Sequence, residues 1–235
     1  MGRHRRRRTT PDPSRREILG GGAMLAAAVL LGGSGSPPAE ADPASPAVTP
    51  AAPRIHDRSD WQAREPEWPA RVLDDAPSYI VVHHTATPNV SDQSQSRAFE
   101  LSRAIQRHHM QHNGWSDTGQ QLTISRGGYL MEGRNGSLEA IRSGRQLLGA
   151  HVRDHNPVTV GIENEGTYHD GDPPTELYDT LVETCAWLCD TYALEPQAIV
   201  GHRDLITTTC PGDQLYAMLP QLRADVAASL GIGSG

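Results

Sequence analysis

The chain has 235 residues, a formal net charge of −7 and no lysine, so its 21 basic residues are all arginines. Seven of these arginines lie in residues 1–41, which leaves 14 arginines against 25 acidic residues and a net charge of −11 for the remainder. A body with that charge is repelled by phosphate-rich surfaces, which argues against a binder of nucleic acid or of an anionic membrane.

Residues 1–41 have the pattern of an export signal. Arg15 and Arg16 precede an apolar, glycine-rich run, Ile18–Gly33, and the small residues "AEA" (Ala39–Ala41) follow at the spacing of a signal-peptidase site. This pattern resembles a twin-arginine signal peptide, which directs folded proteins out of the cytoplasm. The alternative is a membrane anchor, but the run is too short and too rich in glycine to span about 30 Å of hydrocarbon. We therefore expect a secreted protein.

Residues 42–53 continue a proline- and alanine-rich stretch that predicts an extended linker. The globular part is expected to occupy residues 54–235, which is enough chain for one hydrophobic core. Within it, strand and helix patterns alternate. Strands are expected at Tyr79–His84, Val158–Glu163 and Ala198–Gly201, a hairpin over Gln121–Arg134, and helices over Ser94–His112, Leu177–Tyr192 and Asp213–Leu230, the last interrupted near Pro220. This order predicts a single α/β domain with a central mixed sheet flanked by about three helices.

The three cysteines do not make a disulfide framework. Cys185 and Cys189 are four residues apart on one predicted helix, where a bond would close a trivial loop, so we interpret both as small buried residues. Cys210 lies in the polar turn "TTTCPGD" ahead of a predicted helix, whose N-terminal dipole favours a thiolate. This cysteine is therefore a candidate ligand.

Histidines stand at the ends of two predicted strands. "IVVHHTATP" carries His83 and His84, whose side chains point to opposite faces of a strand, so both cannot address one site. His202 ends the strand "AIVGH", eight residues before Cys210. Imidazole and thiolate are zinc ligands, and a site with three protein ligands keeps a fourth position open for catalysis. These residues predict an open zinc site, with the choice between His83 and His84 left open.

A competing histidine pair lies on the helix predicted over Ser94–His112. His108 and His112 are one helical turn apart and could therefore share a metal. The residue after His108 is His109, however, whereas a zincin helix carries a glutamate base at that position. We interpret these histidines as surface or core residues.

Six motifs in this order resemble those of peptidoglycan recognition proteins and of the type-2 N-acetylmuramoyl-L-alanine amidases, which include the phage lysozyme-type amidases. They are "IHDRSDWQA", "IVVHHTATP", "GWSDTG", "GAHVRDHN", "VGIENEG" and "GHRDLITTTCPGDQLYAMLPQLR". The resemblance covers residues 54–230, and the last motif is highly specific. It implies a central mixed sheet with about three helices, one catalytic zinc ion, and cleavage of the bond between the muramyl lactyl group and L-alanine.

The resemblance also assigns the site residues. Its metal ligands correspond to His83, His202 and Cys210, which leaves His84 as a packed or hydrogen-bonded histidine. Glu163 of "GIENEG" matches the glutamate that exchanges protons with water and the departing amine in one branch of the amidases. Glu165 shares a strand face with Glu163, so periodicity alone does not separate the two, and the match favours Glu163.

Three further matched positions are expected to contact substrate. Gln120 stands where many family members have a tyrosine, and a glutamine can hydrogen-bond but cannot act as an acid or base. Thr208 stands where phage-type enzymes have a lysine, and its hydroxyl could donate to an oxyanion. His151 of "GAHV" matches a histidine of the groove. It either contacts substrate or is a buried histidine that satisfies its loop.

Two functions compete at this point. The first is a secreted zinc-dependent amidase, and the second is a recognition module that binds muropeptides without cutting them. Non-catalytic relatives typically lose the cysteine ligand, whereas Cys210 is present here; Gln120 is the feature that favours the binding module. A structural zinc domain ranks last, because a closed site needs a fourth ligand. We expect a monomer whose partner is peptidoglycan or muropeptides, with no nucleic acid and no stable membrane association after signal cleavage.

Overall fold

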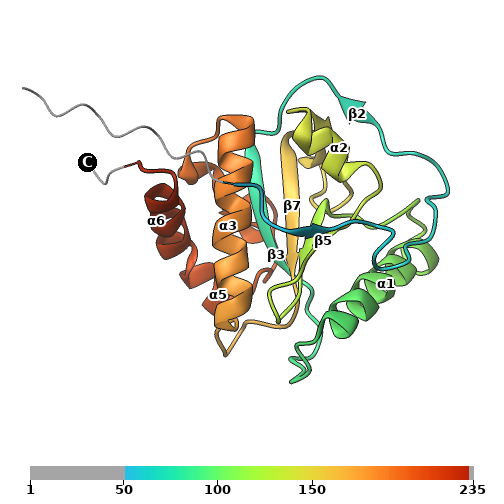
Figure 1. The fold of residues 1–235 in the computed structure, drawn as a ribbon, viewed down its shortest axis with the longest axis horizontal. Coiled ribbons are helices and arrows are strands. Elements are labelled where there is room, and N and C mark those ends of the chain that lie inside the picture. The colour runs from blue at the N-terminus through green and yellow to red at the C-terminus, as the bar shows by residue number, and fades with distance from the viewer. Residues whose placement is uncertain (1–50, 233–235) are drawn as a thin grey trace, which may run out of the picture. The chain divides into compact units, whose positions relative to one another are not determined.

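A six-stranded mixed sheet organises residues 51–232, the part of the chain that this computed structural model describes (Figure 1). The predicted signal peptide and the linker up to residue 50 lie outside the described residues. The strands run in the order β1-β5-β4-β7-β3-β8, and neighbours are parallel except in the antiparallel hairpin β4-β5. They are β1 (Ile55–His56), β3 (Tyr79–His84), β4 (Leu122–Ile124), β5 (Leu130–Glu132), β7 (Thr159–Asn164) and β8 (Ile199–Gly201). A separate antiparallel pair joins β2 (Val72–Leu73) to β6 (Gln146–Leu147).

Helices follow the strands as the sequence pattern predicts. They are α1 (Gln95–Gln111), α2 (Ser137–Arg142), α3 (Thr175–Tyr192), α4 (His202–Leu205), α5 (Asp213–Ala217) and α6 (Leu219–Ser229). Ser94 caps α1 by accepting a hydrogen bond from the N–H of Arg97. Pro220 lies in the first turn of α6, where its missing N–H costs nothing, and this explains the break between α5 and α6. Among the described residues, no helix combines the length and the apolar character needed to cross a membrane.

The pleat of the sheet separates a core face from a site face. Ile80 and Val82 of β3 pack with α3 and α6 in the main hydrophobic cluster. Leu130 belongs to this cluster, whereas the next residue, Met131, packs in a second cluster with Ala98 of α1. Because successive strand residues point to opposite faces, α1 covers the face opposite to α3. Figure 1 shows α3 and α6 on one side of β3 and β7 and α1 on the other.

Strand register places several polar side chains on the face that α1 covers. His83 of β3 pairs with Glu163 of β7, and Val82 pairs with Gly201 at the end of β8. His202 follows immediately as the first residue of α4. The carboxyl ends of three neighbouring parallel strands therefore meet at one edge, which is the usual position of a site in such sheets.

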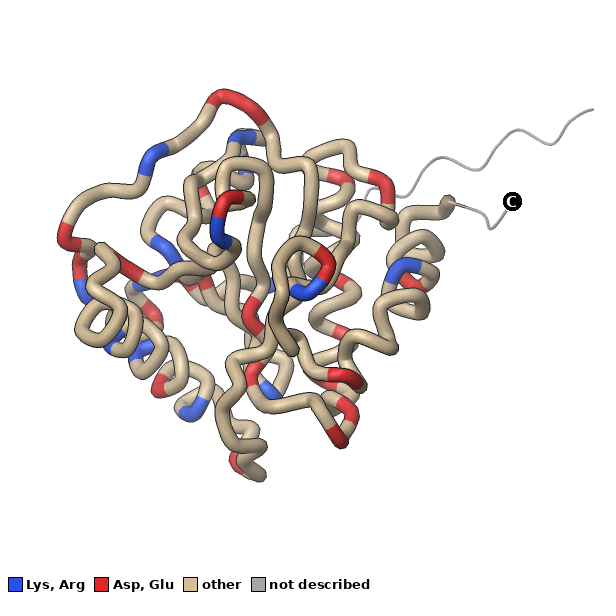
Figure 2. The backbone as a smooth tube through the Cα atoms, turned by 180° about the vertical axis from the view of Figure 1, so that it is seen from behind, with Lys and Arg blue, Asp and Glu red and all other residues tan. Residues whose placement is uncertain are grey.

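Charged residues are interspersed along the backbone, while several arginines gather on α1, at the lower left of Figure 2. These arginines hold α1 to its neighbours. Arg97 lies 3.5 Å from the carboxylate of Glu165, and Arg103 donates to the carbonyl of Trp61 at 2.9 Å. Both contacts anchor the helix that forms one wall of the site described below.

Candidate metal centre

Three predicted ligands converge from three separate elements. His83 ends β3, His202 begins α4, and Cys210 lies in the loop before α5. Their donor atoms all lie within 4.8 Å of one another. Sγ of Cys210 is 3.7 Å from Nδ1 of His83, and the ring centroids of His83 and His202 are 4.4 Å apart.

This donor set fits a zinc ion. With a Zn–S bond of about 2.3 Å and a Zn–N bond of about 2.0 Å, the edge of a zinc tetrahedron is about 3.5 Å, close to the separation of Cys210 and His83. Nε2 of His202 is buried and has no hydrogen-bond partner among the described residues. Burial lowers the pKa of His83 well below its usual range and so keeps the ring in the neutral form that ligates metals.

The thiol of Cys210 needs a neighbouring cation to ionise. Burial, followed by the nearby charge of Glu163, raises its pKa to about 12. A metal ion at the centre of the three donors would reverse this shift, because coordination favours the thiolate. The cysteine is therefore suited to bind a cation and unsuited to act as a free nucleophile.

Glu163 and Glu165 occupy different environments. Glu163 lies beside His83 in register, and its Oε2 is buried without a partner in residues 51–232. Burial raises the pKa of Glu163 to about 8. Glu165 follows the end of β7, accepts from the N–H of Arg126 at 2.9 Å and lies next to Arg97. Glu163 therefore faces the metal centre, whereas Glu165 belongs to the packing around α1.

A cavity of about 300 Å³ brings together every residue that the sequence proposed for the site. Its lining includes His83, Gln120, His151, Glu163, His202, Thr208 and Cys210. Gln120 donates through Nε2 to Thr123 at 2.9 Å, while its Oε1 is buried and unpaired in the described part of the chain. The hydroxyl of Thr208 accepts from the N–H of Cys210 at 3.2 Å.

His84 does not share the role of His83. The N–H of Tyr168 donates to its Nδ1 at 3.4 Å, and its ring packs against His169 with centroids 5.3 Å apart. Burial lowers the pKa of His84 to about 4. The second histidine of the pair is thus a buried, hydrogen-bonded residue beside the centre.

The competing pair, His108 and His112, has exposed side chains whose rings stack with centroids 4.7 Å apart. Across residues 51–232, His83, His202 and Cys210 are the one group of three residues close enough to hold a metal. The helix histidines find no third partner there.

Sequence reasoning missed the contribution of His109. Its Nδ1 accepts from the N–H of Gly119 at 3.1 Å, and its ring packs on Trp115 with centroids 4.6 Å apart. Burial lowers the pKa of His109 to about 4. One available signal is its spacing of four residues from Ile105 and eight from Leu101, which puts His109 on the same face of the helix as these apolar residues.

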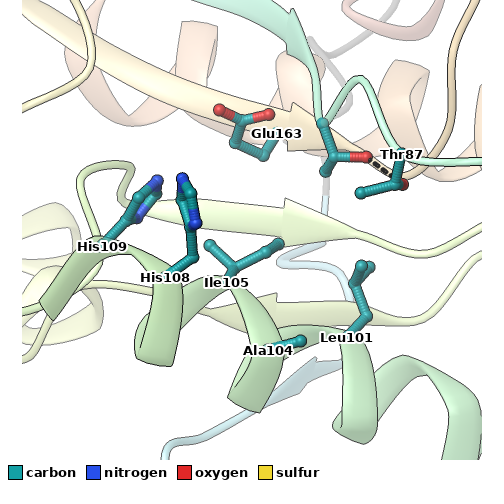
Figure 3. A pocket seen from close by; sticks show the side chains of 8 residues that line it. Thr87, Leu101, Ala104, Ile105, His108, His109 and Glu163 are labelled. Atoms are coloured by element: carbon teal, nitrogen blue, oxygen red, sulfur yellow. Dashed lines mark hydrogen bonds between the residues drawn. The ribbon is translucent and has the colours of Figure 1, made fainter. Parts of the chain in front are cut away.

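A second cavity, of about 350 Å³, adjoins the first and shares His109 and Glu163 with it. Leu101, Ala104 and Ile105 of α1 give this cavity an apolar wall. In Figure 3 His108 and His109 project from α1 toward Glu163, and Thr87 lies beyond Glu163 with its bond to Thr85 drawn. The site is therefore a two-part groove, with the metal centre in one part and an apolar wall in the other.

Comparison with known proteins connects this geometry to a family. The sequence profile of N-acetylmuramoyl-L-alanine amidase matches residues 73–213. The human N-acetylmuramoyl-L-alanine amidase is 32% identical over 170 residues, which are 71% of this chain and 28% of the human protein. The pig protein of the same name is also 32% identical, and the chain spans 27% of its length.

Insect relatives match over more of their length. Peptidoglycan-recognition protein LB of Drosophila melanogaster is 30% identical over 168 residues, which are 71% of this chain and 68% of the relative. Its solved structure superposes with a TM-score of 0.62 at 29% identity, covering 71% of this chain and 92% of that one. The mixed α/β fold predicted from the sequence is thereby confirmed. The chain belongs to the N-acetylmuramoyl-L-alanine amidase family.

Proposed function

We propose that the protein is a zinc-dependent N-acetylmuramoyl-L-alanine amidase, which hydrolyses the amide bond between the lactyl group and L-alanine in peptidoglycan. One observation carries the proposal: the donor atoms of His83, His202 and Cys210 lie within 4.8 Å of one another, in a cavity that Glu163 also lines. Family membership indicates the class of reaction, and the three donor atoms indicate that a metal ion takes part.

His83, His202 and Cys210 would hold the ion and leave one position free. A zinc ion bound there would polarise the amide carbonyl and acidify a water molecule. The buried positions of His83 and Cys210 exclude most solvent, which strengthens each electrostatic interaction in the site.

Glu163 moves the proton. Its carboxylate accepts a proton as the water oxygen forms a bond to the carbonyl carbon, and it returns that proton to the nitrogen as the C–N bond breaks. A pKa raised to about 8 by burial keeps both protonation states accessible near neutral pH. The unpaired Oε2 is free for this exchange.

Other groups of the cavity would position the substrate. The hydroxyl of Thr208 is placed to donate to the developing oxyanion, and the unpaired Oε1 of Gln120 to accept from an amide N–H. His151 forms part of the same wall. The adjoining groove beside His109, with its apolar face on α1, would take the part of the substrate beyond the cleaved bond.

The route to the substrate is also part of the proposal. We infer that residues 1–41 are a twin-arginine signal, that residues 42–53 form a linker, and that the amidase domain, residues 54–235, is exported to act on the cell wall. The partner would be peptidoglycan or its muropeptide fragments, bound by a monomer.

The second candidate function is binding of muropeptides without cleavage. Gln120 favours it, because the side chain offers neither an acid nor a base at a buried position of the cavity. A variant of Drosophila PGRP-LB has been solved in complex with tracheal cytotoxin, and that structure is 29% identical to this chain. The complete ligand set favours catalysis over this alternative.

The deciding experiment treats purified peptidoglycan with the chain from Asp42 onward, with zinc or with a chelator, and measures newly exposed amino groups of L-alanine. Release is expected with zinc and not with the chelator. Glu163→Gln should slow release by about 100-fold or more, because it removes the proton carrier. Cys210→Ser should abolish zinc-dependent release.

Glu165→Gln is the matched control, because it alters the other glutamate of the same motif and should leave most of the activity. Binding to the wall without release, at saturating zinc, would replace the amidase by the recognition module. Equal losses in Glu163→Gln and Glu165→Gln would remove the proton-carrier role from Glu163.

A further inference from the structure

We propose that His151 is a positioning residue for the metal ligand His83, acting through a hydrogen bond between the two imidazole rings. This inference rests on the proposed metal centre. It gives His151 a role that acts through a ligand and needs no contact with substrate.

The two nitrogens of His83 face different partners. Nδ1 lies 3.7 Å from Sγ of Cys210, on the side of the three converging donors. Nε2 lies 2.9 Å from Nδ1 of His151. The rings meet edge to face, with an interplanar angle of 82° and centroids 5.1 Å apart. Nε2 of His83 is therefore hydrogen-bonded to His151, while Nδ1 faces the centre of the three converging donors.

Each hydrogen bond from His83 through His151 to Thr159 has one donor and one acceptor. A neutral imidazole carries one N–H, so a His83 that gives the lone pair of Nδ1 to a metal must carry its proton on Nε2 and donate it to His151. His151 then carries its own proton on Nε2, which lies 3.4 Å from Oγ1 of Thr159. The Thr159 hydroxyl donates to the carbonyl of His155 at 2.9 Å and keeps lone pairs to accept from His151. The arrangement selects the tautomer of His83 that can ligate through Nδ1.

Two glycines make room for the ring of His151. A Cβ on Gly161 of β7 would lie 2.6 Å from Nδ1 of His151, and one on Gly149 would lie 2.6 Å from its Cδ2. Both distances are far below van der Waals contact. The side chain of Asn156 fixes the loop by accepting from the N–H of His151 at 2.8 Å. His151 thus occupies a slot in the sheet face beneath His83.

A ligand that is held in this way binds metal more tightly, because its orientation and tautomer are set before the metal arrives. Loss of such an outer partner typically weakens metal affinity by about 10- to 100-fold. His151 should therefore affect the metal even in the absence of substrate.

The test measures zinc affinity of the full chain by competition with a chromophoric chelator, and the visible spectrum of the Co²⁺-loaded chain. His151→Ala should weaken zinc binding by about 10- to 100-fold and shift the Co²⁺ bands. Gly161→Ala should also weaken zinc binding, because the new methyl group displaces the ring of His151, which is still present in this variant. His151→Asn should restore affinity toward that of the unaltered chain, since its Oδ1 offers an acceptor near the position of Nδ1.

His155→Ala is the matched control, because the ring of His155 makes no hydrogen bond within residues 51–232 and zinc affinity should stay unchanged. Circular dichroism of each variant checks that it is folded. If His151→Ala and Gly161→Ala bind zinc within twofold of the unaltered chain with unchanged Co²⁺ bands, the positioning role is overturned. Variants that raise KM or lower Tm while zinc affinity and the Co²⁺ bands stay unchanged would overturn it as well.

Failure of the unaltered chain to bind zinc would overturn the proposed function as well. If the unaltered chain binds zinc, and His151→Ala and Gly161→Ala leave the zinc affinity and the Co²⁺ bands unchanged, only the positioning role is overturned. The two failures are therefore distinguishable.

Discussion

Glu163 illustrates what burial does to a single ionisable group. Its carboxyl group has an ordinary pKa of 4.5, and burial raises this pKa to about 8 in the folded chain. Between these two values the folded state keeps a proton that the unfolded state has released. The free energy of unfolding therefore falls as the pH rises through this window, and the loss is complete above about pH 8.

We predict that this loss is measurable in the metal-free chain between pH 6.5 and 8. The buried His83 and His151, whose pKa values are lowered chiefly by burial, are neutral in the folded state over this range. Their unfolded forms lose protons equally in the unaltered chain and in Glu163→Gln, so this contribution cancels in the comparison. Denaturant unfolding should show the unaltered chain losing up to about 2 kcal/mol relative to Glu163→Gln across that range. Parallel stability curves for the two chains would show that the carboxyl group is not protonated in the folded state.

Asp117 acts on a larger scale, because it joins elements that are far apart in the sequence. Its carboxylate lies 3.0 Å from Arg58, accepts from the side chain of Gln106 on α1 at 2.8 Å, and accepts from the N–H of Asn135 before α2 at 2.8 Å. The side chain of Asp117 is 1% exposed and that of Arg58 is 12% exposed. This carboxylate fixes the loop that leads from α1 to Gln120.

We predict that Asp117→Ala lowers the free energy of unfolding by about 3 kcal/mol, because it deprives the largely buried guanidinium of Arg58 of its charged partner and removes the acceptor that Gln106 and Asn135 share. The comparison is Glu100→Ala, which breaks a pair with Arg97 at 3.9 Å where the glutamate is 62% exposed. That change should cost less than about 1 kcal/mol. Equal effects in denaturant unfolding would show that the Asp117 network contributes nothing beyond a surface ion pair.

The long elements were predictable because their patterns repeat. The strand at Tyr79–His84 has the predicted bounds, and the helices predicted over Ser94–His112 and Leu177–Tyr192 differ from α1 and α3 by two residues or fewer at each end. The two-residue strands β1, β2 and β6 were missed, because two residues show no periodicity and their pairing depends on distant chain. The short α2 was missed for the same reason: six residues hold less than two full turns.

The candidate site likewise has residues that could be predicted from the sequence and contacts that could not. His83, His202, Cys210 and Glu163 stand in motifs, and the structure gathers all four in one cavity. The contact between His83 and His151 could not be predicted, since it depends on a slot above Gly161 that exists once β7 pairs with β3. Motif spacing identifies ligands, whereas the partners of those ligands depend on tertiary packing.

At the scale of the whole molecule, the candidate metal centre draws its donors from elements that are far apart in the sequence. His83 and Cys210 are 127 residues apart, and His202 comes from a third element. The unfolded chain cannot hold these donors together, so a bound ion stabilises the folded state by mass action.

We predict that removal of zinc by a chelator lowers Tm by about 10 °C. Free zinc at about 1,000 times Kd contributes about 4 kcal/mol, and in a domain of this size each kcal/mol shifts Tm by about 2–4 °C. Cys210→Ser should lose most of the shift. Cys189→Ala is the control. It truncates a buried core side chain and should lower Tm, but the chelator should still shift Tm by the same amount. If the unaltered chain has the same Tm with and without the chelator, zinc binding is contradicted.

The alternation of β3 and β7 between core and cavity sets how this protein can be redesigned. Ile80 and Val82 fill the core while His83 of the same strand faces the metal centre, so a single inserted residue would exchange both sets at once. An insertion or deletion in these strands would therefore alter folding and chemistry together. The apolar wall on α1, with Ala104 exposed and Ile105 partly buried, is different, because its side chains change the groove without displacing a ligand. Libraries aimed at new substrates should therefore vary the helix and leave the sheet untouched.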